Sequence, residues 1–179
     1  VKVLIALDRG DEAAKIEARF GPLEEPEAAE EEVAAAADVE AKLEQAVMLK
    51  LNGGLGTGMG LSKAKSLLPL KADATFLDFI AKQVGHMRTT SGQSLAFMLM
   101  NSFSTSADTL AYLSKYAGLA AGGLPLEFQQ NKAPKVTAAD LSPAAWPAAP
   151  ACEWCPPGHG DLYPAIVGSG TLDLLIAKG

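Results

Sequence analysis

The sequence predicts an α/β fold with a doubly wound, mostly parallel β-sheet. Short continuous apolar runs, typical of strands buried on both faces, alternate along the chain with amphipathic helical segments. A glycine-rich segment, Gly53–Gly60, directly follows one of these runs. Ligands of parallel sheets bind beyond the carboxyl ends of the strands, so this segment is the expected position of a binding site.

Length and composition limit the class of protein. The chain has 179 residues, of which 49% are hydrophobic and 20% charged, as in an ordinary globular domain or part of a larger one. A net charge of −6 argues against a surface that neutralises nucleic-acid phosphates. No apolar run approaches the roughly 20 residues of a membrane helix, and no signal peptide opens the chain. Neither nucleic acid nor membrane is an expected partner, and the oligomeric state stays open.

The chain divides into an acidic, helical leader and a larger α/β part. The leader, residues 1–45, could begin with a strand at Val1–Leu7, and its Ala- and Glu-rich composition favours helix from Glu27 onward. Residues 46–179 carry the alternating pattern of strands and helices. The chain starts with Val rather than Met and ends directly after a helical pattern. We therefore expect it to be a fragment of a longer protein.

The α/β part contains three expected strands and several expected helices. The strands are Ala46–Leu51, Ser94–Met100 and Leu124–Phe128. A first helix is expected to be capped by Thr75, and its apolar residues at helical spacing are Phe76, Phe79, Ile80, Val84 and Met87. Further helices are expected at Ala107–Tyr116 and, as two short pieces, within Leu162–Lys178. Residues 133–151, which are rich in Pro and Ala, are expected to form a surface loop.

The two cysteines, Cys152 and Cys155, form a single C-x-x-C pair. A disulfide framework requires more cysteines, so a reducing, cytoplasmic compartment is expected. A zinc site requires three or four ligands, and His159 is the only further candidate nearby. We interpret the pair as two small buried residues, with a metal or redox role as the alternative.

The glycine segment fits neither of the common phosphate-binding motifs. A Walker A loop requires glycine directly before Lys65, where Ala64 stands, and a dinucleotide fingerprint that starts at Gly54 requires glycine at Met59. The glycines at 54, 56, 58 and 60 instead recur at every second residue. Glycine lets backbone N–H groups approach a ligand closely, and the following lysines add positive charge. The segment is therefore expected to wrap a nucleotide.

Four blocks of the sequence resemble the UTP–glucose-1-phosphate uridylyltransferase family, whose members are also called UDP-glucose pyrophosphorylases. The blocks are LKLNGGLGTGMG at 49–60 followed by AKS at 64–66, MNSFSTSADT at 100–109, EFQQNKAPKV at 127–136 and WCPPGHGDLYPAI at 154–166. The resemblance covers residues 46–179 and not the leader. It implies a Rossmann-like nucleotidyltransferase sheet of the GT-A type, incomplete because the chain is a fragment. It also implies an enzyme that converts UTP and glucose 1-phosphate into UDP-glucose and pyrophosphate with Mg²⁺.

The resemblance implies a role for the glycine segment and for one lysine. Main-chain groups of four residues would line the UTP site: Leu51, Asn52, Gly53 and Gly54. Lys65 would be the catalytic lysine that reaches the nucleotide phosphates. In the family a proline usually precedes this lysine, whereas this chain has Ala64, so the loop is expected to be less rigid here.

The later blocks imply the remaining site residues. Gln130 would read the uracil edge, since a carboxamide offers both a donor and an acceptor. Gly158 would pack beside the base, and His159 would donate to the phosphate of glucose 1-phosphate. Asp161 is expected to cap the following helix. For three polar residues we leave two roles open, loop orientation and helix capping: Asn101, Ser102 and Thr105.

One element of the family pattern is absent. In the family, an N-x-D motif whose aspartate binds magnesium follows the region that matches LDLLIAKG, and this chain ends at Gly179. No metal ligand is therefore expected within the chain. Phosphoryl transfer without a metal carboxylate loses much of its charge neutralisation. We predict that this piece alone is inactive or nearly so, and that the full protein is active.

Two alternatives stay open. Another UDP-sugar or UDP-N-acetylhexosamine pyrophosphorylase is the nearer one, although those relatives have divergent glycine loops that typically contain arginine. The second comes from a different class: a non-catalytic nucleotide-binding module, with the C-x-x-C pair as its metal or redox group.

Overall fold

The structure is a computed structural model that describes residues 42–56, 60, 62–71 and 73–178. These residues all belong to one compact unit, Ala37–Gly179. The strand predicted at Val1–Leu7 and the helix predicted from Glu27 lie outside the described residues, apart from one helical turn at 42–44. The predicted division of the chain at residue 45 therefore stays a prediction.

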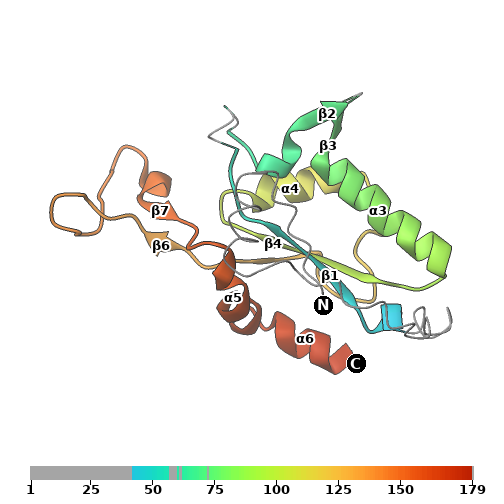
Figure 1. Cartoon of the computed structure of the whole chain (residues 1–179). Coiled ribbons are helices and arrows are strands. Elements are labelled where there is room, and N and C mark those ends of the chain that lie inside the picture. The colour runs from blue at the N-terminus through green and yellow to red at the C-terminus, as the bar shows by residue number, and fades with distance from the viewer. Residues whose placement is uncertain (1–41, 57–59, 61, 72, 179) are drawn as a thin grey trace, which may run out of the picture. The chain divides into compact units, whose positions relative to one another are not determined.

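A parallel three-stranded sheet forms the centre of the described unit. Its strands are β1 (Val47–Asn52), β4 (Ala96–Asn101) and β5 (Glu127–Gln129), in the order β1-β4-β5 (Figure 1). All three predicted strands are confirmed. The third is shorter than predicted at its start, because Pro125 has no N–H to donate to the neighbouring strand. The asparagines that end β1 and β4 lie opposite each other in register.

Helices cover both faces of this sheet, which confirms the doubly wound α/β fold. All six residues of β4 are buried. Phe97 and Leu99 face α3 (Phe76–Ser91) and α4 (Ser106–Leu113), while Met98 and Met100 pack with residues of α5 (Leu162–Gly168) and α6 (Thr171–Lys178) on the opposite face (Figure 1). A continuous apolar run is what such a two-sided strand requires, since alternate residues enter different cores.

The predicted cap of helix α3 is confirmed. The Thr75 side chain accepts a hydrogen bond from the Asp78 N–H, and the Asp78 carboxylate accepts one from the Thr75 N–H, which is a capping box. Gly92, in the left-handed conformation at φ 69°, ends the helix.

The apolar face predicted for α3 is only partly correct. Leu77, Ala81 and Val84 are buried, whereas Phe76 and Phe79 are 44% and 53% exposed. The small Ala81 is not part of the predicted apolar set, although its position one turn after Leu77 places it on the buried face.

Short elements connect the main ones. A 3-10 turn, η2 (Lys65–Leu67), precedes the antiparallel pair of β2 (Pro69–Lys71) and β3 (Ala74–Thr75). The predicted 133–151 loop instead begins in an antiparallel ladder between β6 (Ala133–Pro134) and β7 (Trp154–Cys155). A 3-10 turn, η3 (Pro150–Glu153), leads into β7, and η4 (His159–Asp161) leads into α5. Two-residue strands have too short a pattern to be recognised by periodicity.

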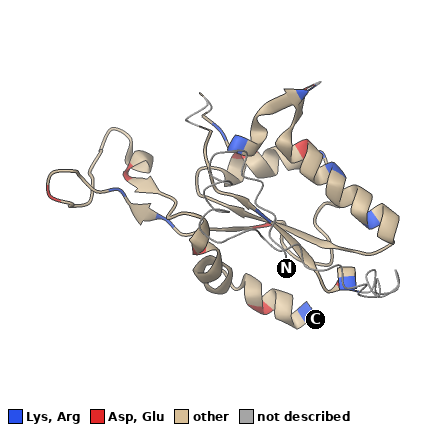
Figure 2. Cartoon of the chain, in the orientation of Figure 1, with Lys and Arg blue, Asp and Glu red and all other residues tan. Residues whose placement is uncertain are grey.

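The interpretation of the cysteines as buried residues is wrong. Cys152 is exposed and Cys155 half-buried, and both are free thiols. They lie in η3 and β7, and neither element contributes a residue to the two described core clusters. In the described part of the chain, Lys and Arg occur singly on several elements (Figure 2). No helix described here combines the length and the apolar character that a membrane crossing requires.

Candidate active site

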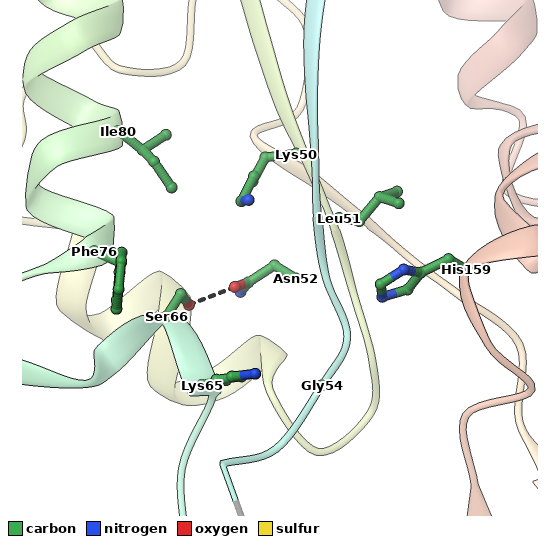
Figure 3. Close-up of a pocket in the computed structure, with 9 residues that line it drawn as sticks. All are labelled: Lys50, Leu51, Asn52, Gly54, Lys65, Ser66, Phe76, Ile80 and His159. Carbon is green, nitrogen blue, oxygen red and sulfur yellow. Dashed lines mark hydrogen bonds between the residues drawn. The ribbon is translucent and has the colours of Figure 1, made fainter. Parts of the chain in front are cut away.

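A hollow of about 270 Å³ lies where β1 ends and the glycine segment begins (Figure 3). It brings together five of the residues predicted for the site: Leu51, Asn52, Gly54, Lys65 and His159. The four other lining residues are Lys50, Ser66, Phe76 and Ile80. Lys50 and Asn52 point to one side of β1, and Leu51 and His159 lie on the other (Figure 3). The hollow therefore extends around the end of the strand.

Gly53 and Gln130 lie against each other, although they follow β1 and β5, which are the two outer strands of the sheet. A Cβ atom on Gly53 would lie 2.0 Å from Nε2 of Gln130 and 2.8 Å from its Cδ, so any larger residue here would displace the Gln130 carboxamide. Gln130 is 6% exposed, and its Oε1 is buried without a hydrogen-bond partner among the described atoms. Its backbone N–H donates to the Asn101 carbonyl at 2.8 Å, which holds it against the end of β4. An unsatisfied buried acceptor of this kind is rare, and a ligand donor would satisfy it.

Gln130 lines a second hollow rather than the first. Its neighbours there are Phe103, Gln129, Asn131 and Lys132. Gly53 lines neither hollow, but it directly follows Asn52 of the first and lies against Gln130 of the second. The predicted site residues are thus divided between two hollows that Gly53 separates by a single residue position along β1's end.

The base of the glycine segment is a short antiparallel pairing. Leu55 bridges Ala64, the Gly56 N–H donates to the Lys63 carbonyl at 3.0 Å, and the Lys65 N–H donates to the Gly54 carbonyl at 3.0 Å. This pairing returns the chain to the start of the segment and places Lys65 beside Gly54. The alternating glycines beyond it include Gly58, which lies with its neighbours outside the described residues, so the predicted wrapping by that part stays a prediction.

Replacing Ala64 by proline is expected to stabilise the unit. Ala64 has φ −51° and ψ 134°, close to the φ that proline fixes, and its N–H takes part in neither bond of the pairing. Proline there would restrict the unfolded chain, and we expect a gain of about 0.4–1 kcal/mol in the free energy of unfolding. Chemical denaturation of Ala64→Pro measures it. A lower unfolding midpoint than that of the wild type would contradict the expectation.

Asn52 contributes its side chain to a buried polar network. Its Nδ2 donates to Asn101 Oδ1 at 2.6 Å and to Thr109 Oγ1 at 2.9 Å, and its Oδ1 accepts from Ser66 Oγ. The hydroxyl of Thr105 donates to the Asn52 carbonyl at 2.8 Å. We predicted main-chain contacts with the ligand for Asn52, and the structure adds this structural role for its side chain.

Two roles were left open for Thr105, loop orientation and helix capping, and the structure supports loop orientation. Thr105 Oγ1 makes no cap hydrogen bond to α4; it accepts from the Ser102 N–H at 2.9 Å and donates to Asn52 across the sheet. Asn101 likewise orients its neighbours, because its Nδ2 donates to Glu127 Oε2 at 2.5 Å.

The cap predicted for Asp161 is wrong. Its carboxylate makes no cap bond to α5 and instead accepts from the Asn131 N–H at 2.6 Å and from Asn131 Nδ2 at 2.9 Å. This contact ties the segment after Gln130 to the turn that carries Gly158 and His159. Gly158 has φ 113°, which favours glycine, but it lines neither hollow. His159 is exposed and lines the first hollow.

Sequence reasoning missed Lys50 and Ser66. Lys50 lies two residues before Asn52, so strand alternation would have placed both on one face and beside Lys65. Ser66 directly follows Lys65, and its neighbour in the network, Asn52, could not be recognised from spacing. Among the described residues, neither Lys50 nor Lys65 forms an ion pair. Both lysines are therefore available to an anionic ligand.

The described residues include no preformed cluster of metal ligands. No group of three or more His, Cys, Asp or Glu side chains within this part of the chain could hold a metal ion. Two carboxylates of the surrounding elements, Glu127 and Asp161, accept hydrogen bonds from Asn101, Ser106 and Asn131.

Comparison with known proteins identifies the family. The family model described as UTP–glucose-1-phosphate uridylyltransferase matches residues 7–179. The chain belongs to this family. The match extends into the leader, for which the sequence predicted no resemblance. The uridylyltransferase of Solanum tuberosum is 40% identical over 145 residues, which cover 80% of this chain and 30% of that protein. A probable uridylyltransferase of Schizosaccharomyces pombe is 39% identical over 138 residues, which cover 76% of this chain and 27% of that protein.

Solved structures of the family have the same fold. A UDP-glucose phosphorylase from Trypanosoma brucei is 51% identical with a TM-score of 0.70, covering 78% of this chain and 30% of its own. A mutant UDP-glucose pyrophosphorylase from Leishmania major, in complex with UDP-glucose, is 49% identical with a TM-score of 0.70 and the same coverage. The chain thus spans about 30% of the length of these relatives. The fold predicted from the resemblance is confirmed.

Proposed function

We propose that this chain supplies the UTP-binding part of an enzyme that makes UDP-glucose and pyrophosphate from UTP and glucose 1-phosphate. The observation that carries the proposal is the buried, unpaired Oε1 of Gln130 against Gly53. Family membership and the relative bound to UDP-glucose support the same ligand class.

Gln130 suits the recognition of uracil. The N3–H of uracil is a donor between two carbonyl acceptors, and a carboxamide offers the complementary acceptor and donor. Leaving a buried acceptor unpaired costs about 1–3 kcal/mol, so a base that supplies the donor gains over one that does not. Cytosine has an acceptor at N3 and its donor at the neighbouring N4, so only a shifted base or a flipped carboxamide would satisfy Oε1 of Gln130.

The lysines suit the triphosphate. Gly54 exposes its backbone beside Lys65, which is itself exposed, and Lys50 lines the same hollow. We propose that Lys65 faces the phosphates and neutralises the charge that develops as pyrophosphate leaves. His159, across β1, would donate to the phosphate of glucose 1-phosphate, whose oxygen attacks the α-phosphorus of UTP. Positioning and charge neutralisation then carry the reaction, since the residues described as lining the two hollows include no Ser, Thr or Cys paired with a base.

Magnesium and a cytoplasmic location belong to the proposal as well. The phosphates of UTP are ligands that Mg²⁺ prefers, and the ion would balance charge that the two lysines leave uncompensated. Two free thiols suit a reducing compartment. Because the chain spans 30% of its relatives, turnover is proposed for the whole protein, and nucleotide binding is the property to test in the chain itself.

Replacing Gln130 by leucine is expected to weaken UTP binding about 10- to 100-fold, because leucine can neither donate to nor accept from the base. The wild-type chain is expected to bind UTP more tightly than CTP, and Gln130→Leu to lose this preference. Calorimetric titration measures both. Gln83→Leu, at an exposed position of α3, is the matched control and should bind as the wild type does. Equal affinity of the wild type for UTP and CTP would contradict the proposal.

The sugar is tested separately in the whole protein. Pyrophosphate release is compared with glucose, galactose and N-acetylglucosamine 1-phosphates at equal concentration. Glucose 1-phosphate is expected to give the highest kcat/KM. A higher value with either of the others would assign the protein to another UDP-sugar specificity.

A further inference from the structure

Ser66 directly follows Lys65 in η2, which we call the lysine turn. Lys65 begins the 3-10 turn η2 and is exposed, whereas Ser66 is half-buried. The backbone holds the turn by the Lys65 N–H bond to the Gly54 carbonyl and by the Leu67 N–H bond to the Ala64 carbonyl at 2.9 Å. No side chain caps η2 at its start. Among the described residues, the hydroxyl of Ser66 supplies the side-chain hydrogen bond that joins this turn to the sheet.

The partner of Ser66 is an oxygen whose direction is fixed. Ser66 Oγ donates to Asn52 Oδ1 (Figure 3). The amide nitrogen of the same side chain donates to Asn101 Oδ1 and to the Thr109 hydroxyl. Asn101 Oδ1 can only accept, and its amide is oriented by the Glu127 carboxylate, so the oxygen of Asn52 has to face Ser66. Asn52 is 6% exposed and cannot exchange these partners for water at low cost.

The network continues to the residue proposed to read the base. The Asn101 carbonyl accepts from the Gln130 N–H at 2.8 Å, while its side chain connects Asn52 to Glu127. A continuous path of hydrogen bonds thus runs from the lysine turn, through Ser66, Asn52 and Asn101, to Gln130. Its members come from η2 and from the ends of β1 and β4, with Gln130 directly after β5.

We propose that Ser66 is a positioning residue that sets the distance between Lys65 and Gln130. This inference rests on the proposed function, because it assigns Lys65 to the phosphates and Gln130 to the base. A nucleotide held at both ends requires a fixed span between its two anchors. A lysine on an unattached turn would have to be ordered on binding, at an entropic cost that a preorganised turn avoids.

The test compares ligands that use one anchor or both. Ser66→Ala removes the hydroxyl, and it is expected to weaken UTP binding about tenfold, the effect of losing one hydrogen bond. Uridine, which lacks phosphates, is expected to bind Ser66→Ala within about twofold of the wild type in NMR titrations, because Gln130 keeps its own contacts. Ser66→Thr retains a hydroxyl and should restore UTP binding. Ser62→Ala, at an exposed position in the same segment, is the control for alanine substitution.

A double-mutant cycle separates positioning from a general structural effect. If Ser66 acts through Lys65, adding Ser66→Ala to Lys65→Ala should not weaken UTP binding further. Equal losses for UTP and uridine, or additive losses in the cycle, would overturn the inference while leaving the proposed function intact. Thermal unfolding of each variant verifies that it is folded.

A ligand-free measurement covers the case in which the proposed function fails. If the wild type binds no UTP, the amide exchange of Lys65 still reports on its turn, because this N–H donates to Gly54. Ser66→Ala is expected to accelerate this exchange about tenfold, with Leu99 of β4 unchanged. An unchanged exchange rate at Lys65 would overturn the positioning role.

Discussion

Replacing Gly53 by alanine is expected to weaken UTP binding at least as much as the loss of Gln130 itself, about 10- to 100-fold. The new Cβ would lie 2.0 Å from the Gln130 carboxamide nitrogen, a separation that atoms do not tolerate. The carboxamide is the end of a flexible side chain, so it can turn away at a small cost in stability. The unfolding midpoint should therefore change little, while UTP affinity and the preference for UTP over CTP fall together.

A double-mutant cycle shows whether Gln130 mediates this effect. In a Gln130→Ala background, Gly53→Ala no longer meets the carboxamide and should cause little additional loss of UTP binding. Gly85→Ala, on α3, is the control for a glycine in open space, because a Cβ atom there would have no neighbouring atom within 4 Å outside its own helical backbone. Full affinity in Gly53→Ala would show that Gly53 and Gln130 are not held as the structure places them.

Replacing Asp78 by alanine is expected to cause the largest loss of stability, about 3 kcal/mol. The carboxylate is buried and accepts from Tyr112 and Tyr116 hydroxyls at 2.5 Å each, from the Thr75 N–H at 2.6 Å, and from Lys115 Nζ at 2.6 Å. Its removal leaves the helix cap and both tyrosine hydroxyls without their acceptor. Urea denaturation of Asp78→Ala measures the loss, and Asp173→Ala, at an exposed first-turn position of α6, should lose much less.

The same carboxylate makes stability depend on pH. Burial by itself raises the pKa of Asp78, but Lys115, the Thr75 N–H and the two tyrosine hydroxyls outweigh burial and hold its pKa below the ordinary value of 3.8. The folded pKa is below the unfolded one, so this stabilisation is complete above the unfolded pKa and is lost as pH falls below about 3.8. Asp78→Asn should therefore show a smaller loss of stability between pH 5 and the acid limit than the wild type. Parallel curves for the two proteins would contradict this assignment.

The interactions of Asp78 differ in how far the sequence could predict them. The capping box of α3 is local, since Thr75 and Asp78 are three residues apart, and Thr75 was predicted as the cap from the sequence. The acceptor role of Asp78 toward Tyr112 and Tyr116 was not predicted, because these residues come from another part of the chain. Phe76 was predicted at the apolar spacing, yet it borders the hollow, because the buried side of α3 is set by the sheet it packs on.

The sequence by itself determined the order of strands and helices, the glycine segment and the family, because each depends on patterns within a few residues of one another. Only the tertiary structure decided that Gly53 lies against the Gln130 carboxamide, and that Ser66, Asn52 and Asn101 connect the two ends of the site. The parallel pairing of β1, β4 and β5 brings their carboxyl ends to one edge. The spacing of residues along the chain does not show which side chains meet at this edge. That depends on the register of the strands, because a shift of one residue would turn each side chain to the other face.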